Sequence, residues 1–320
     1  MNRMSYFGKI AFCAISLFSL ATGAIGQASL RKAFDFNNDA KADFVIFRST
    51  DSTWYILKSN GAIHVQPFGI ANDDYSTPGD FDGDGIGDLA VWRNSNGTWY
   101  RVNSATNTFA VQPWGSEGDE PVARDYTGDG KTDFAVVRKS GGVLTWYVLA
   151  STPAQEIYVD AFGLEGDFVA PGDYDGDGKF DLAVQRPGAS PTALGTFYIR
   201  NSLGYQVYQW GFSNDLVVPG DYDGDGKTDL AVVREGTLPT DVLTWYILKS
   251  SNGGIQIQNW GLTGSDLTVQ NDYDGDGKTD IAVWRNDDGK FYVLRSQDGG
   301  ISVTQWGLEN DYPVATYDTH

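Results

Sequence analysis

Nine-residue stretches crowded with carboxylates recur along the chain. Two copies are identical, "DYDGDGKTD" at 221–229 and 272–280, and related stretches begin at residues 35, 80, 125 and 173. Side-chain oxygens stand at positions 1, 3, 5 and 9, and glycines at positions 4 and 6 of most copies permit a tight turn around one point. Two carboxylates ~5 Å apart repel by about 3 kcal/mol at an effective dielectric constant of ~20, so a divalent cation would turn a costly loop into a stable one.

Oxygen ligands at this density suit calcium better than magnesium, which keeps waters in a tighter octahedron. We expect position 7 to offer its backbone carbonyl, as position 7 of an EF-hand loop does. A solvated acidic turn is the alternative, but six copies in one register argue against it. The predicted metal ligands are Asp35, Asn37, Asp39, Lys41 and Asp43; Asp80, Asp82, Asp84, Ile86 and Asp88; Asp125, Thr127, Asp129, Lys131 and Asp133; Asp173, Asp175, Asp177, Lys179 and Asp181; Asp221, Asp223, Asp225, Lys227 and Asp229; and Asp272, Asp274, Asp276, Lys278 and Asp280.

Two of the six loops depart from the pattern. Loop three has Thr127 at position 3, which loses one negative ligand. Loop one, "DFNNDAKAD", has Asn37 at position 3, Asn38 at position 4 and Ala40 at position 6. Alanine in a left-handed conformation costs roughly 1 kcal/mol or more. We therefore expect up to six structural calcium ions, bound most weakly at 35–43 and 125–133.

The elements that must hold these loops form a repeat of 45 to 51 residues. After each loop come an apolar run ending in arginine ("LAVVR"), a run with an aromatic pair ("TWYILKS"), a run ending in an aromatic residue and glycine ("VQPWG"), and a short lead-in to the next loop ("LVVPG"). Short runs rich in β-branched and aromatic residues, bounded by Gly, Asn, Ser or Asp, are typical of strands. Four strands per unit, with the loop joining the first to the second, predict an all-β, six-bladed propeller of four-stranded antiparallel blades. A linear β-solenoid is the alternative, but its rungs are usually shorter.

The chain ends predict how the ring closes. Residues 311–315, "DYPVA", match "DEPVA" at 119–123, which opens the first strand before loop three. The first unit has a poor lead-in of its own, "LRKAF". We therefore predict that residues 312–317 complete blade one, which would remove an open sheet edge. If residues 28–34 filled that place instead, the terminal strand at 312–320 would be free for self-association.

Together, "DYDGDGKTDLAVVR", "WYILKS" and "WG" resemble the FG-GAP/VCBS repeat family of extracellular propellers, to which integrin-α heads and some fungal lectins are similar in this loop. The resemblance covers residues 35–311. It implies an integrin-α-like propeller with calcium in the acidic loops.

The opposite end of such a propeller would carry two other sixfold features. The first is the arginine that ends each second strand, and the second is an acid four or five residues after each aromatic-glycine pair. A ring of arginines could grip anionic sugars, but equal numbers favour arginine–aspartate pairs that fix blade to blade. The arginines are Arg48, Arg93, Arg138, Arg186, Arg234 and Arg285, and the acids are Asp73, Asp119, Asp167, Asp215, Asp266 and Asp311.

Composition and the N-terminus place the protein outside the cell. A basic start, an apolar run from Ile10 to Ala21 and small residues before position 27 predict a cleavable signal peptide at 1–26 and a single propeller domain of six repeats at 27–320. The run is shorter than the ~20 residues of a membrane-spanning helix. Cleavage of the signal peptide would remove the single cysteine, Cys13, so bound metal would stabilise the mature chain in place of disulfides. The net charge of −19 argues against nucleic acid or an anionic membrane as partner, and the sequence has no second apolar run long enough to predict membrane insertion.

We expect a secreted binding module, for adhesion or for recognition of a glycan or a protein, that uses the face opposite the calcium loops. Long connections at 187–195 and 235–243 make blades three to five the best place for a ligand. The strict repeat positions of the aromatic pairs favour a role in the core. The alternative is a structural subunit of a surface assembly or filament that uses the terminal strand. A polysaccharide-cleaving enzyme is less favoured, because His64 and His320 are the only histidines and most acids already have a predicted role.

Overall fold

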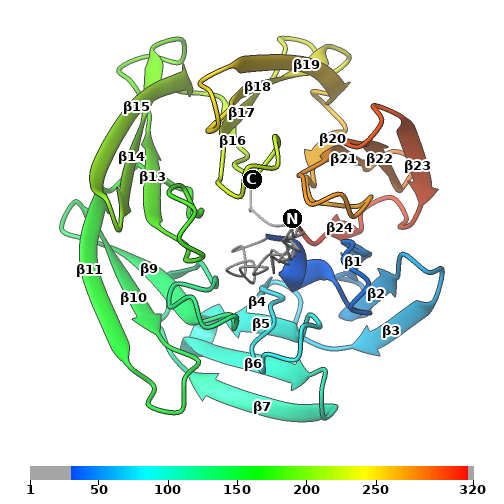
Figure 1. Cartoon of the computed structure of the whole chain (residues 1–320). Coiled ribbons are helices and arrows are strands. Elements are labelled where there is room, and N and C mark those ends of the chain that lie inside the picture. The colour runs from blue at the N-terminus through cyan, green and yellow to red at the C-terminus, as the bar shows by residue number, and fades with distance from the viewer. Residues whose placement is uncertain (1–29, 316–320) are drawn as a thin grey trace, which may run out of the picture.

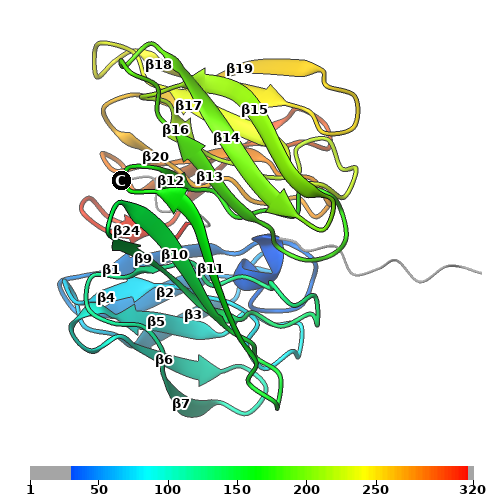
Figure 2. The same cartoon turned by 90° about the vertical axis from the view of Figure 1, so that its left-hand side faces the viewer.

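Six four-stranded sheets stand in a ring around a central axis in the computed structural model, which describes residues 30–315. Figure 1 looks along this axis and Figure 2 shows the ring from the side. All strand pairs within the sheets are antiparallel, and the order within each sheet follows the chain except in blade one. The predicted six-bladed propeller is therefore confirmed.

Each blade runs from an inner first strand to an outer fourth strand (Figure 1). The strands are, in blade one, β24 (Tyr312–Pro313), β1 (Phe44–Arg48), β2 (Thr53–Leu57) and β3 (Ile63–Pro67); in blade two, β4 (Asp74–Ser76), β5 (Leu89–Arg93), β6 (Thr98–Asn103) and β7 (Thr108–Pro113); in blade three, β8 (Glu120–Pro121), β9 (Phe134–Ser140), β10 (Val143–Leu149) and β11 (Ile157–Leu164); in blade four, β12 (Phe168–Val169), β13 (Leu182–Arg186), β14 (Leu194–Asn201) and β15 (Gly204–Phe212); in blade five, β16 (Leu216–Val217), β17 (Leu230–Arg234), β18 (Val242–Leu248) and β19 (Ile255–Leu262); and in blade six, β20 (Asp266–Thr268), β21 (Ile281–Arg285), β22 (Lys290–Leu294) and β23 (Ile301–Gln305). Two short 3-10 helices, η1 (Leu30–Phe34) and η2 (Asn94–Asn96), complete the described elements.

The C-terminal strand closes the ring in blade one, as predicted. Pro313 and Tyr312 of β24 pair with Ile46 and Phe47 of β1, and the Val314 N–H donates to the Val45 carbonyl. Residues 30–34 form the helix η1 and no strand, so the competing arrangement with an N-terminal first strand is wrong over this span.

The burial of each strand follows from its place in the blade. Second strands such as "LAVWR" are buried on both faces, because each lies between two neighbouring blades. Fourth strands alternate between exposed and half-buried residues, because they form the rim. Blade faces pack on one another as expected: Trp92 and Trp99 of blade two share one cluster with Phe134 and Val136 of blade three.

Blades three to five differ from the other three in one consistent way. Their third and fourth strands have 7 to 9 residues, whereas those of blades one, two and six have 5 or 6. The register between the third and fourth strands also shifts at one place in each long blade, next to Thr145, Thr196 and Thr244. Such β-bulges re-aim the strand beyond them.

Several predictions concern residues that the structure does not describe. The signal peptide at 1–26 lies outside residues 30–315, as do His320 and the last residues of the predicted closing segment. No helix among the described residues is long and apolar enough to cross a membrane.

Candidate metal centre and the opposite face

The six acidic loops join into a closed ring at one end of the propeller. In every loop the backbone N–H of position 8 donates to the position 1 carbonyl of the preceding loop, at N···O distances of 2.6 to 2.8 Å. The pairs are Ala42 to Asp272, Gly87 to Asp35, Thr132 to Asp80, Phe180 to Asp125, Thr228 to Asp173 and Thr279 to Asp221. The loops therefore hold one another in place as well as their own blades.

Inside a loop, the position 1 carboxylate organises the turn. In loop four, Asp173 Oδ1 accepts the Gly176 N–H at 2.7 Å and Oδ2 accepts the Gly178 N–H at 3.0 Å. Both glycines have positive φ, +78° and +88°, which explains their spacing. Loop one adopts the same turn without glycine: Asn38 and Ala40 have φ of 56° and 68°. The strain predicted at Ala40 therefore exists.

The position 9 aspartates are the most buried acids of every loop except loop four, where Asp173 is more buried than Asp181. In five blades one oxygen accepts the N–H of position 2, and the other accepts the N–H of the serine that follows the third strand, as Asp88 does from Phe81 and Ser104. Blade four is the exception, because the Ser202 N–H donates to Asp175 instead of Asp181. Position 9 thus ties the loop to the end of the third strand.

Burial raises the pKa of these position 9 carboxyls. The pKa rises to about 6 at Asp43, Asp88, Asp133, Asp229 and Asp280, and to about 8 at Asp181. Loss of hydration is the main cause, and neighbouring aspartates add to it. Backbone N–H donors act in the opposite direction. Each loop therefore favours a bound proton or a bound cation.

The donor set fits a divalent cation. In loops two, four, five and six, three carboxylate oxygens lie within 4.8 Å of one another; the groups are Asp80, Asp82 and Asp84; Asp173, Asp175 and Asp181; Asp221, Asp223 and Asp225; and Asp272, Asp274 and Asp276. Buried position 3 oxygens in three loops have no hydrogen-bond donor among the described residues: Asn37 Oδ1, Thr127 Oγ1 and Asp223 Oδ1. A buried oxygen without a donor is costly, and a cation would satisfy it.

Loops one and three have no such group of three close acidic oxygens within residues 30–315. These are the two loops predicted to bind most weakly. In loop three, the Lys131 Nζ at position 7 donates to the Asp82 carbonyl of loop two at 2.9 Å. This side chain points at the neighbouring loop, which leaves the backbone carbonyl as the candidate ligand of position 7.

The opposite face carries the expected arginine–aspartate pairs. Every arginine binds its aspartate through Nε and Nη2, as Arg186 binds Asp167 at 2.8 and 2.9 Å. The remaining pairs are Arg48–Asp311, Arg93–Asp74, Arg138–Asp119, Arg234–Asp215 and Arg285–Asp266. The hydrogen bond to the aspartate is the largest cause of the raised pKa of these arginines.

Two details of that prediction were wrong. Asp74, not Asp73, makes the close bidentate pair with Arg93, because Asp74 lies directly across β4 and β5 from it. Asp73 binds Ser95, and its carboxylate is a longer second partner, 3.9 Å from Arg93 Nε. The two partners also belong to one blade. The link between blades comes from the second role of the aspartate, which accepts an N–H from the end of the preceding blade. Asp311 does so from Leu308.

The aromatic pairs divide into a core residue and an arginine platform. The first members, Trp54, Trp99, Trp146, Phe197, Trp245 and Phe291, are at most 1% exposed, which agrees with the expected core role. The second member is a half-buried tyrosine beneath the arginine, at 4.3 to 4.7 Å. His64 lies in β3 opposite Ile56 of β2, with an exposed side chain.

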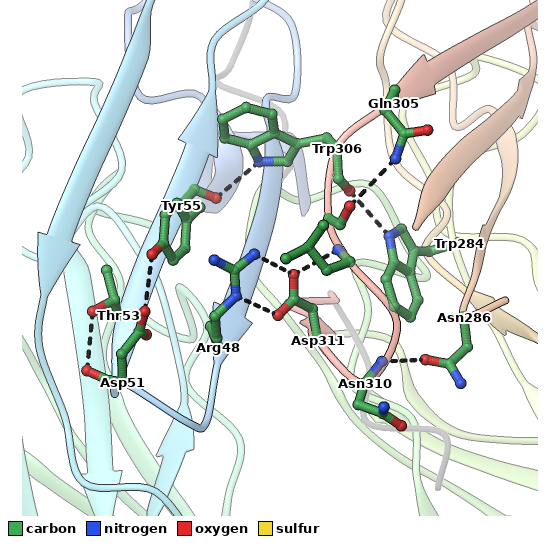
Figure 3. Close-up of polar contacts among 12 residues, drawn as sticks. Arg48, Asp51, Thr53, Tyr55, Trp284, Asn286, Gln305, Trp306, Asn310 and Asp311 are labelled. Atoms are coloured by element: carbon green, nitrogen blue, oxygen red, sulfur yellow. Dashed lines mark hydrogen bonds and ion pairs between the residues drawn. The ribbon is translucent and has the colours of Figure 1, made fainter. Parts of the chain in front are cut away.

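Sequence reasoning missed one contact between blades. The tryptophan before the glycine donates its indole N–H to the tyrosine carbonyl of the next blade, as Trp114 does to Tyr147 and Trp306 to Tyr55. Trp306 thereby joins blade six to blade one (Figure 3). The repeated "WG" was the available signal, but its partner lies 33 residues away or, for Trp306, 251.

Comparison with known proteins agrees with this architecture. The model of the FG-GAP-like repeat matches residues 35–91, 80–136 and 125–184. No curated protein sequence matches the chain.

Solved structures with a similar fold include an Agrocybe aegerita lectin described for specific recognition of non-reducing terminal N-acetylglucosamine. It has a TM-score of 0.53 and 16% identity over 85% of this chain and 94% of that one. A mutant of AofleA from Arthrobotrys oligospora has a TM-score of 0.56 and 10% identity, with 84% of both chains covered. A putative 6-phosphogluconolactonase from Bacteroides fragilis has a TM-score of 0.45 and 11% identity over 87% of this chain and 98% of that one. At these identities the first two likenesses establish the fold alone, and the third carries no argument.

Proposed function

We propose that this protein, which belongs to the FG-GAP repeat family, is a secreted, calcium-stabilised β-propeller that recognises a glycan through the face opposite its acidic loops. The observation that carries the proposal is the contrast between the two faces. The acidic loops repeat with little variation and bind one another in a ring. The connections between second and third strands vary, and variable loops on a rigid scaffold are where recognition usually resides.

Calcium is the cation that this proposal assigns to the loops. Carboxylate, amide, hydroxyl and carbonyl oxygens without nitrogen or sulfur ligands are typical of calcium sites. The residues that would hold it are the loop positions 1, 3, 5, 7 and 9 given above, with all six loops as candidates. Calcium would offset the repulsion between the carboxylates of each loop, and its role is structural.

A glycan is the favoured ligand class for two reasons. The propeller fold of the Agrocybe lectin shows that such a ring can recognise a sugar, although it assigns no site here. The net charge of −19 disfavours polyanionic partners. Assembly through the terminal strand is less favoured, because Tyr312 and Pro313 are paired with β1.

A glycan array tests this proposal, with the protein in calcium and, separately, in EDTA. We expect saccharide binding in calcium and weaker binding in EDTA, since the scaffold loosens without its cation. Deletion of 187–195 together with 235–243 should abolish binding, while calcium should still raise the melting temperature. If the deletion variant still binds the saccharide, the ligand site lies elsewhere and the assignment to this face is wrong.

A further inference from the structure

Blades three, four and five each carry an arginine–tyrosine pair that differs from its counterparts in blades one, two and six. Side-chain exposure of the arginine is 35%, 33% and 30% at Arg138, Arg186 and Arg234. It is 21%, 19% and 24% at Arg48, Arg93 and Arg285. The two groups do not overlap, although all six arginines bind an aspartate in the same way.

The tyrosine hydroxyl shows the same division. In blades one, two and six a side chain three residues after the arginine bonds this hydroxyl: Asp51 to Tyr55, Asn96 to Tyr100 and Asp288 to Tyr292, at 2.7 to 3.0 Å. In blades three, four and five the longer connections put no such residue in place. No connection side chain described between residues 30 and 315 bonds the hydroxyl of Tyr147, Tyr198 or Tyr246, and each of these hydroxyls interacts with its arginine instead.

Each of these blades also has two apolar residues beside its arginine–tyrosine pair, which together we call its apolar wall. Beyond the β-bulge, the third and fourth strands continue past the arginine and set two apolar residues opposite each other: Val143 with Leu164, Leu194 with Phe212, and Val242 with Leu262. Leu164, Leu194 and Val242 are 45%, 51% and 49% exposed. The shorter strands of the other blades end before this point.

At one junction, the wall of one blade borders the arginine of the next. Phe212 of blade four lies over the Arg234 guanidinium of blade five at 3.7 Å, and Tyr246 covers its other face at 4.5 Å. Asp215 occupies Nε and Nη2. The Nη1 end of the guanidinium is not bonded to Asp215, and it lies at an edge flanked by aromatic rings.

We infer that the pairs Arg138–Tyr147, Arg186–Tyr198 and Arg234–Tyr246 are three related subsites for a neutral saccharide. Nη1 donates to a sugar hydroxyl, the tyrosine hydroxyl both donates and accepts, and the apolar wall packs on the C–H face of the ring. A small number of convergent polar groups beside an apolar surface is the usual composition of such sites. The inference rests on the proposed glycan-binding function and names the residues that perform it.

The charge of the site and of the whole chain favours a neutral sugar over an acidic one. The buried aspartate occupies the Nε–Nη2 edge of each guanidinium and neutralises its charge, so the site offers no net positive charge to a second carboxylate. The chain as a whole carries −19, so an acidic sugar would be repelled. A sugar hydroxyl needs only one of the N–H donors that the aspartate does not use.

The test uses three tyrosine-to-phenylalanine substitutions in one chain, Y147F/Y198F/Y246F, which remove the hydroxyls and keep the rings beneath the arginines. The matched control is Y55F/Y100F/Y292F, the same change in the blades whose hydroxyls bond the connections. The probes are printed neutral and uronic-acid oligosaccharides, followed by calorimetric titration, in calcium, with the neutral oligosaccharide that the wild type binds best. Thermal melting and circular dichroism check the fold of both variants.

We expect Y147F/Y198F/Y246F to weaken binding at least tenfold at an unchanged fold, and the control to bind as the wild type does. Each single variant should weaken binding less than the triple variant, because three subsites on one scaffold add avidity. Equal losses in both triple variants, wild-type binding by Y147F/Y198F/Y246F, or a preference for uronic acids would overturn the inference and leave the proposed function standing. If the wild type binds no printed saccharide, the proposed function fails, and the inference with it. If the triple variant does not fold, the three single variants decide by the same criterion.

Discussion

In four blades a tryptophan–glycine pair lies in or directly after the fourth strand, and one hydrogen bond between blades explains this tryptophan. Trp114, Trp210, Trp260 and Trp306 donate their indole N–H to a tyrosine carbonyl of the next blade at 3.0 to 3.3 Å. Blades one and three have Phe68 and Phe162 in this place, so the ring tolerates phenylalanine there. Tryptophan therefore adds strength at a junction that packing already forms.

Trp306→Phe tests this at the junction that closes the ring (Figure 3). We expect the free energy of unfolding to fall by about 1 kcal/mol, the usual net value of one hydrogen bond, with the fold unchanged. Urea unfolding in calcium measures the change, and Trp210→Phe is the control at a junction within the ring. A variant as stable as the wild type would mean that the indole N–H contributes nothing.

The weak loops can be tested at one position. Thr127→Asp gives loop three the carboxylate that loops five and six have at position 3, in place of the buried Thr127 hydroxyl that lacks a hydrogen-bond partner. We expect calcium affinity at this site to rise on the order of tenfold, because affinity follows ligand charge.

Thr127→Asn is the control, since it supplies an oxygen without charge, as Asn37 does in loop one. It should fall between Thr127 and the aspartate variant in calorimetric calcium titration. If both variants bind alike, charge at position 3 does not set the affinity.

At the scale of the element, each acidic loop couples its blade to a cation and to pH. Burial raises the pKa of Asp88, Asp133 and Asp229 from 3.8 to about 6. Without calcium, the folded state therefore holds protons more tightly than the unfolded chain. The stability that this contributes is complete below pH ~4 and is lost as the pH rises through ~6.

The calcium-free protein should accordingly melt at a lower temperature at pH 7.5 than at pH 5. Calcium needs the same carboxyls deprotonated, so its stabilising effect should grow over this interval. Melting curves at both pH values, in EDTA and in calcium, measure both effects. A calcium-induced shift that is equal at pH 5 and pH 7.5 would contradict this account of the loops.

At the scale of the whole molecule, closure depends on a few residues at the C-terminus. β24 supplies the first strand of blade one, and Val314 enters its core. A chain that stops after Asp311 keeps the Arg48–Asp311 pair and loses the strand. We expect a lower melting temperature and concentration-dependent association, because β1 then becomes an open edge.

Light scattering coupled to size-exclusion chromatography measures the association. A chain that stops after Ala315 is the control, because it retains all of β24, and it should behave as the full chain does. Equal behaviour of the two truncated chains would show that β24 does not carry the closure.

Much of the architecture was predictable because short local motifs specify it and the whole unit occurs six times. The acidic loop, the arginine at the end of each second strand and the aromatic-glycine pair each mark one step of the blade, so repetition gave the blade number. The match between 311–315 and 119–123 even predicted the closing strand. Loop positions and the weakness expected of loops one and three follow from residue type, because the position 1 carboxylate and the glycine turn act within nine residues.

Contacts between distant segments were decided only by the tertiary structure. Asp73 and Asp74 are adjacent in sequence, and strand register alone puts Asp74 across from Arg93. The indole N–H of Trp306 meets a carbonyl 251 residues away because the ring closes. The β-bulges of blades three to five, and the exposed arginine–tyrosine pairs beside them, arise from strand lengths that the sequence marks only as long connections. Residue types set what each segment can do, and the packing of blade on blade determines which of those groups meet.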